Sequence, residues 1–262
     1  MKHRAWTAIF MACAAAAAAA APAAGQQNAD ANRMTIPLSD PNRPATVDVN
    51  LFGGAITVRA YSGKEVIVTA RGDRDVFRPD SRAQGLKRLT TGRISIDEAN
   101  NVVTIRSGRS DSPDIEIQVP VRTNLKLRSM NEGIEVEGVD GDIEANSQND
   151  YVTLTNVSGS VVAHSQNDDV RVTMTRVAAD KPMAFSSANG DVDVTLPAGT
   201  KANVRMTTHN GDIWTGFDIQ VNETGLLDRP GKSQTMTGAI NGGGPDFQFR
   251  SLNGNIYIRR GN

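Results

Sequence analysis

Hydrophobic and polar residues alternate along most of the chain after Ala45. Val47, Val49 and Leu51 are separated by single polar residues, and the same pattern recurs at 56–60, 66–70, 94–96, 103–105 and 115–119. A period of two with polar partners is typical of β-strands that bury one face. The pattern therefore predicts an all-β chain. Only residues 81–91, where Leu86 and Leu89 are three apart, depart from it and predict a loop or one helical turn.

From Ser129 onward the alternation becomes a sequence repeat. Ser or Thr is followed two residues later by Asn, and three residues after the Asn by Ile or Val. The six copies are centred on Asn131, Asn149, Asn167, Asn189, Asn210 and Asn253. Successive Asn residues are 18, 18, 22, 21 and 43 positions apart, and a degenerate copy at 235–240 falls inside the longest gap. Repeats of this length predict stacked structural units that share one core.

The first two copies predict how one unit is built. Five apolar positions and one glycine recur 18 residues later: Ile134, Val136, Val139, Gly141, Ile143 and Ala145 return as Val152, Leu154, Val157, Gly159, Val161 and Ala163. Each unit then holds two short strands joined by turns, and stacked units bury a common column of aliphatic side chains. We predict a single-domain parallel β-solenoid (β-helix-like) with coils of 18–22 residues over 45–262. Its repeat part spans 129–259.

The repeated Asn has a structural explanation. Asn tolerates left-handed backbone and bonds to its own turn, and Gly follows it in three copies. Stacked Asn side chains can also form amide ladders between coils. We interpret the six as structural turn residues rather than binding residues.

Residues 1–25 have the anatomy of a secretory signal peptide. Lys2 and Arg4 precede an uncharged Ala-rich run, and the small residues up to Ala23 fit a cleavage site. Two alternatives stay open: an uncleaved membrane anchor, which Pro22 and the weakly apolar alanines disfavour, and lipidation of Cys13. Residues 26–44 are expected to form a linker and an entry strand.

Composition and charge narrow the compartment and the partners. The chain has 28 basic and 29 acidic side chains, a balance that argues against a duplex nucleic-acid binder. Cleavage would remove the single cysteine, so the exported chain would depend on core burial and backbone pairing. We expect a periplasmic, secreted or cell-surface protein with no nucleic-acid partner and no transmembrane domain after cleavage.

Several segments resemble a known family. They are 115–120 (IEIQVP), 125–134 (LKLRSMNEGI), the repeated Asn-Gly-Asp corners and a second strand-Pro element at 194–197 (VTLP). Together they are similar to the putative-adhesin or "toast-rack" family of bacterial envelope proteins, over about residues 47–259. The resemblance implies an exported β-solenoid with no established activity, and it supplies no catalytic residues. An insert near 77–91 and the region 220–244 depart from the pattern.

Catalytic motifs are absent from the sequence, and His164 and His209 fall in different coils, where we interpret both as exposed turn residues. The enzyme alternative is a polysaccharide lyase or hydrolase on a β-helix, which needs aromatic platforms and clustered acids in one groove. The surface aromatic candidates are Tyr151, Trp214 and Tyr257, of which the last two are predicted to point outward on the same face. Their simpler interpretation is as surface residues that cover apolar area.

One acidic column is a candidate cation site. Asp169, Asp191 and Asp212 each lie two residues after a repeat Asn, and Ca²⁺ could bridge carboxylates on neighbouring coils about 4.8 Å apart. Solvated turn residues are the favoured interpretation, so we expect no resident cofactor, with calcium as the hypothesis to test.

The expected function is a non-enzymatic one. We expect an exported solenoid that acts as an adhesin-like or cell-envelope scaffold and binds an envelope or surface protein or a glycan. A flat polar face would favour this function, whereas a groove with clustered acids beside Trp214 would favour the enzyme.

Overall fold

The computed structural model describes residues 32–71, 94–108, 113–222 and 234–261. The predicted signal peptide, the first part of the linker and the segment 81–91 lie outside these residues. No helix of the described residues is long and apolar enough to cross a membrane.

All regular elements of the described chain are β-strands, as the alternation predicts. They are β1 (Arg33–Pro37), β2 (Ala45–Leu51), β3 (Ile56–Tyr61), β4 (Glu65–Arg71), β5 (Ile94–Ala99), β6 (Val102–Ser107), β7 (Asp114–Pro120), β8 (Thr123–Ser129), β9 (Ile134–Glu137), β10 (Asp140–Ser147), β11 (Val152–Ser165), β12 (Val170–Val177), β13 (Met183–Ser187), β14 (Val192–Leu196), β15 (Ala202–Thr208), β16 (Ile213–Thr215), β17 (Gln220–Asn222), β18 (Gln234–Ile240), β19 (Asp246–Ser251) and β20 (Ile256–Arg260).

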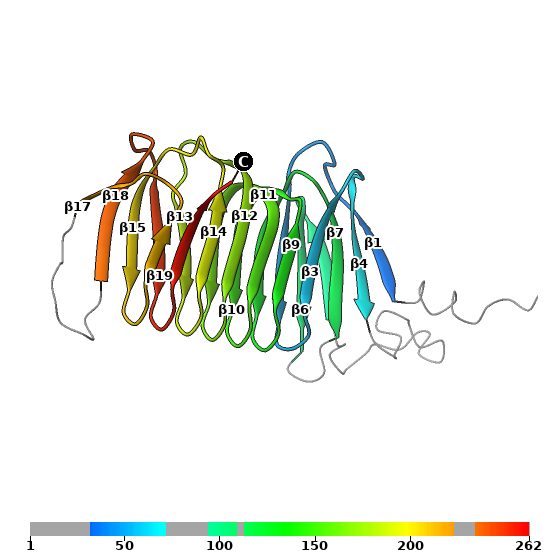
Figure 1. The fold of residues 1–262 in the computed structure, drawn as a ribbon. Helices are drawn as coiled ribbons and strands as arrows, with labels where there is room; N and C mark the ends of the chain where they lie inside the picture. Colours follow the sequence, from blue (N-terminus) through cyan, green and yellow to red (C-terminus); the bar gives the residue numbers. More distant parts are fainter. Residues whose placement is uncertain (1–31, 72–93, 109–112, 223–233, 262) are drawn as a thin grey trace, which may run out of the picture.

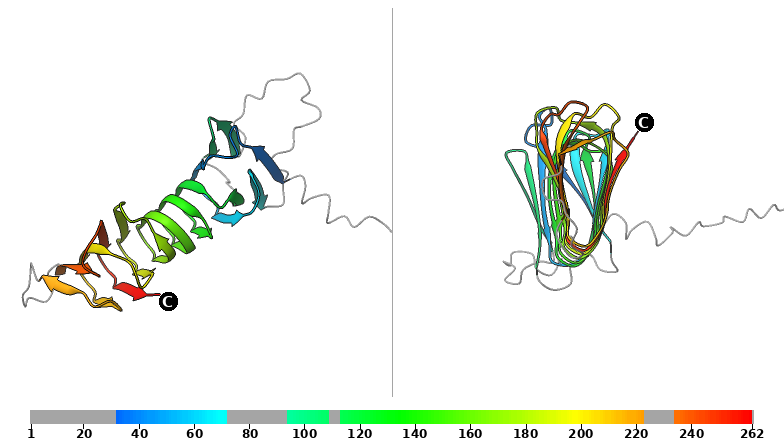
Figure 2. Two further views of the ribbon diagram at one scale, coloured as in Figure 1. Left: turned by 90° about the horizontal axis from the view of Figure 1, so that it is seen from above. Right: turned by 60° about the vertical axis from the view of Figure 1, so that its left-hand side comes forward.

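The strands wind into a flattened solenoid with two faces (Figures 1 and 2). The first face has the hydrogen-bonded order β5-β6-β2-β8-β10-β11-β13-β19-β15-β18-β17. The second face has the order β1-β4-β7-β3-β9-β11-β12-β14-β20-β16. Pairing between coils is parallel, so the predicted all-β parallel solenoid is confirmed. β11 belongs to both faces, because its two halves are continuous through an irregular register between Leu154 and Ser158.

The order of the coils in space differs from their order in the sequence at both ends. The coil of β2 and β3 lies between the coil of β6 and β7 and the coil of β8 and β9. In the same way, the coil of β19 and β20 lies between the coil of β13 and β14 and the coil of β15 and β16. Each inserted coil therefore holds together two coils that follow one another in the chain.

Antiparallel strands close the ends of the stack. β5 pairs antiparallel with β6 and β4 with β7, while β18 pairs antiparallel with β15. The degenerate copy predicted at 235–240 is thus wrong as a repeat, because this segment is the antiparallel strand β18. Such end strands cover edges that would otherwise offer free backbone groups for pairing.

The core is a column of aliphatic side chains between the two faces. Val152, Leu154, Val170 and Val172 are at most 2% exposed, whereas Arg171 between the last two is exposed. The aliphatic column predicted to include Val152 and Leu154 is therefore confirmed, and it continues through Val170 and Val172. Near the C-terminal end the column changes to aromatic rings, with Phe185 and Phe249 stacked at 5.2 Å between ring centroids.

Candidate functional site

The Ser or Thr of the repeat motif is buried and connects neighbouring coils. The six hydroxyl residues are at most 5% exposed: Ser129, Ser147, Ser165, Ser187, Thr208 and Ser251. Ser165 is representative, because its hydroxyl donates to the Asp150 carbonyl at 2.9 Å and accepts the Asp168 amide at 3.1 Å. It satisfies a turn N–H of its own coil and a carbonyl of the preceding coil at once. A buried hydroxyl with both partners in place is a structural element.

The repeat Asn residues form a continuous amide ladder along the stack. In each step one Nδ2 donates to the Oδ1 of a neighbouring coil, over 2.8–3.1 Å. The spatial order is Asn131, Asn149, Asn167, Asn189, Asn253 and Asn210, and Asn131 donates to the Phe52 carbonyl. The structure thus brings all six together in one row, in which their side-chain amides hydrogen-bond to one another.

The acidic column differs from the arrangement that the calcium hypothesis requires. Asn255 of the inserted coil lies between Asp191 and Asp212, so the placement of the three aspartates in successive coils is wrong. Oδ1 of Asp169 accepts the Asp191 amide at 2.7 Å, and Oδ1 of Asp191 accepts the Asn255 amide at 2.7 Å. The described residues contain no group of three His, Cys, Asp or Glu that could hold a metal ion.

Tyr151 occupies the same turn column two coils before Asp191. Its ring lies over Gly133, where a Cβ would stand 2.8 Å from the ring, so glycine leaves the space that the ring fills. The hydroxyl donates to Oε1 of Glu135 at 2.8 Å. This hydrogen bond, helped by partial burial and the Glu135 charge, raises the pKa of Tyr151 to about 12.

Trp214 and Tyr257 lie side by side in register on the outer side of the second face. Trp214 is 57% exposed. Arg259 stacks over the Tyr257 ring at 5.3 Å and donates two hydrogen bonds to Asp193, at 2.7 and 2.9 Å. Tyr151 is separate from this pair, because β12 and β14 stand between β11 and β20.

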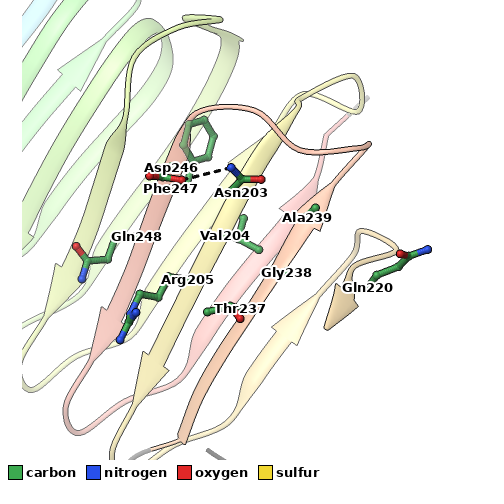
Figure 3. Close-up of a pocket in the computed structure, with 10 residues that line it drawn as sticks. All are labelled: Asn203, Val204, Arg205, Gln220, Thr237, Gly238, Ala239, Asp246, Phe247 and Gln248. Carbon is green, nitrogen blue, oxygen red and sulfur yellow. Dashed lines mark hydrogen bonds between the residues drawn. The ribbon is translucent and has the colours of Figure 1, made fainter. Parts of the chain in front are cut away.

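The first face carries an open groove that no sequence pattern indicated. Its volume is about 800 Å³, and it runs across β19, β15 and β18 to the beginning of β17. Figure 3 shows the side chains on it: Asn203, Arg205, Gln220, Thr237, Ala239, Asp246 and Gln248. Asn203 donates to the Gly244 carbonyl at 2.8 Å. These strands are far apart in the sequence, which is why the sequence offers no signal for the groove.

A second groove on the first face is lined by residues of β2, β6, β8, β10 and β11 and has a volume of about 600 Å³. Val162 on its border is 42% exposed.

His164, expected in a turn, lies instead within β11, where Nδ1 is 2.9 Å from the Ser186 hydroxyl. β11 continues to Ser165 and the turn occupies 166–169, so His164 precedes the turn. His209 is exposed in its turn, as expected.

Comparison with known proteins adds a family match. A family model described as Toastrack DUF4097 matches residues 25–258. A crystal structure described as a "putative cell adhesion protein" from Clostridium sporogenes is similar over 87% of this chain and 99% of its own, at 10% identity and a TM-score of 0.42. A "putative adhesin" from Bacteroides fragilis is similar over 87% and 95%, at 13% identity and a TM-score of 0.30. A search of curated proteins found no match.

Proposed function

The chain belongs to the Toastrack DUF4097 family, and we propose that it is a non-enzymatic, exported solenoid that binds a component of the cell envelope or cell surface. The observation that carries the proposal is the construction of the molecule. Buried hydroxyls and the Asn ladder connect the coils of the stack that Figure 2 shows. The outward positions of the strands on both faces are mostly polar. A rigid surface of this kind is suited to adhesion or scaffolding, which need no catalytic group.

The surroundings of Trp214 favour binding over polysaccharide cleavage. A glycosidase needs two carboxyl groups whose oxygens can reach substrate or water. Asp193, which is in register with Tyr257 beside Trp214, has both oxygens bonded by Arg259, so this carboxylate is already used within the molecule. An exposed tryptophan beside a tyrosine supports a surface that contacts sugar rings or a protein, and the bidentate arginine stabilises that surface.

Export is the part of the proposal that rests on the sequence. The basic start, the Ala-rich run and the small residues near Ala23 support a cleaved signal peptide and a periplasmic, secreted or surface location. We expect protein recovered from the periplasm or the medium to begin near residues 24–27. Intact Met1 on membrane-bound material would contradict export by cleavage.

Envelope binding is tested with the full exported chain. Purified protein is incubated with sedimented envelope fractions of the producing cell, and retention is measured with and without excess unlabelled protein. Saturable retention supports the proposal. Retention at background level, together with turnover of a polysaccharide substrate, would instead support the enzyme.

A further inference from the structure

We propose that the groove across β19, β15 and β18 binds an acidic glycan. The carboxylates and hydroxyls of the glycan are the groups that the groove recognises. The inference rests on the proposed binding function and deepens it, because it assigns one site and one class of ligand. The groove described above has two relevant properties. It is hollowed, and its arginine, Arg205, has no ion pair or hydrogen bond among the described residues, whereas its carboxylate, Asp246, accepts a hydrogen bond from Asn203 at 3.4 Å.

Arg205 and Arg250 lack partners among the described residues, unlike several arginines of the second face. Arg59, Arg171 and Arg259 on the second face are paired with Glu116, Asp169 and Asp193. In contrast, the described part of the chain offers no ion pair or hydrogen bond to Arg205 or Arg250, and both are exposed. Two guanidinium groups whose N–H donors have no partner among the described residues can bind an external anion.

The register places these two cations close together. Arg205 pairs with Gln248 and Thr207 with Arg250, so the arginines are diagonal neighbours on β15 and β19. From the spacing between strands and the rise along a strand, their Cα atoms lie roughly 8 Å apart. One extended ligand lying across β19 and β15 can therefore contact both. The chain as a whole has a net charge of −1, so the attraction must come from this local pair.

The remaining side chains favour a glycan over a protein as the ligand. Gln220 and Gln248 are exposed amides, and among the described residues neither has a hydrogen-bond partner. A side-chain amide both donates and accepts hydrogen bonds, as a sugar hydroxyl does, so each glutamine can pair with sugar hydroxyls in either role. Phe247 and Val204 are at most 2% exposed and contribute only to the floor of the groove. The apolar anchors that dominate protein interfaces are thus missing from the described lining.

Calorimetric titration of the full exported chain tests the assignment. The probes are oligogalacturonate, a neutral malto-oligosaccharide of the same length, poly-L-glutamate, and vesicles of phosphatidylglycerol. We expect oligogalacturonate to bind with an affinity that falls as salt rises. Arg205→Ala should weaken binding about tenfold or more, and adding Arg250→Ala should weaken it further. The control is Arg33→Ala in β1, which removes the same charge from an exposed arginine at the opposite end of the stack.

Each outcome has one meaning, provided that the melting temperatures of the variants match the wild type. Equal affinity for oligogalacturonate in Arg205→Ala and Arg33→Ala would overturn the site. Equal binding of the neutral oligosaccharide would overturn the role of charge, and equal binding of poly-L-glutamate or vesicles would overturn the glycan. Absence of oligogalacturonate binding with saturable envelope retention would overturn this inference alone. Absence of both would overturn the proposed function as well.

Discussion

The Ser or Thr and the Asn of the repeat motif contribute unequally to stability. The Ser or Thr is buried and bonded on both sides, whereas the Asn of the same motif is exposed and bonds to its copies in neighbouring coils. Removing a hydroxyl that serves a buried N–H and a buried carbonyl leaves both unpaired, and water cannot replace it. Water can replace a lost ladder bond at the surface. The two positions should therefore differ in what a substitution costs.

Ser165→Ala should lower the free energy of unfolding by about 1–3 kcal/mol, because the Asp168 amide and the Asp150 carbonyl lose their partner. Asn167→Ala breaks two ladder bonds of 2.9 Å but at an exposed position, so we expect about 1 kcal/mol or less. Denaturant unfolding measures both. A larger loss for Asn167→Ala would contradict the assignment of the hydroxyl as the main connector.

Tyr151 should ionise later than an ordinary tyrosine. Its pKa of about 12 means that the folded state keeps the proton between pH 10 and 12 while the unfolded state releases it. Stability from the Glu135 hydrogen bond is therefore present below pH 10 and is lost as pH rises towards 12. Absorbance at 295 nm, with circular dichroism to follow folding, should show one late step. Tyr151→Phe should remove this step, and Glu135→Gln should move it to lower pH.

Strand elements are specified by which residues of the alternation face the column. In β11, Leu154 is 1% exposed while Thr153 faces outward between Glu135 and Arg171 of its neighbouring strands. The turns are specified by glycine where coils approach closely. Gly159 has φ of 109°, and a Cβ there would stand 2.2 Å from the Gly141 carbonyl oxygen. The recurrence of Gly141 as Gly159 has this close approach of two coils as its reason.

Leu154→Ala should cost about 2–4 kcal/mol, because it removes a buried side chain and leaves a cavity in a column that cannot collapse freely. Thr153→Ala on the same strand should change stability by about 0.5 kcal/mol or less. Thermal or chemical unfolding of the two variants measures the difference. Equal effects would contradict the assigned register, and a larger loss for Thr153→Ala would indicate the opposite one.

Across the whole molecule, the inserted coils determine which parts depend on one another. β20 lies between β14 and β16, so these two strands have no direct pairing in the described structure and are joined through β20. The coil of β2 and β3 has the corresponding position at the other end. Each end of the solenoid is thereby fixed by a segment distant in the sequence from at least one of its neighbours.

Truncation after Leu252 should loosen one end of the stack and leave the other intact. Removing β20 deletes the strand to which both β14 and β16 bond. Hydrogen exchange followed by mass spectrometry should show faster exchange in β14 and β16 and unchanged protection in β2, β8 and β10. Removal of residues 261–262 alone is the control and should leave all of these strands protected. Uniform loss of protection would indicate that the solenoid unfolds as one unit.

Much of the architecture could be predicted because its cause is local. A period of two places alternate side chains on opposite faces of a strand, so Val152 and Leu154 are recognisable as core residues without a structure. The 18-residue recurrence likewise indicates stacked coils, and the shared column position of Trp214 and Tyr257 already suggests that they lie on one face. The buried role of the repeated hydroxyls was not recognised, because a Ser beside a turn looks the same whether buried or exposed.

The order of the coils could not be obtained in this way. Every coil presents nearly the same pattern of edge hydrogen bonds and inward aliphatic residues, so a repeat states that coils stack but not which coil lies beside which. That choice is made by non-local pairing: it places β20 between β14 and β16, Asn255 between Asp191 and Asp212, and β19 beside β15. The prediction that Asp169, Asp191 and Asp212 lie in successive coils is wrong for this reason. The groove lined by Arg205, with Arg250 near it on β19, could not be predicted for the same reason, since it exists only where strands from different parts of the chain meet.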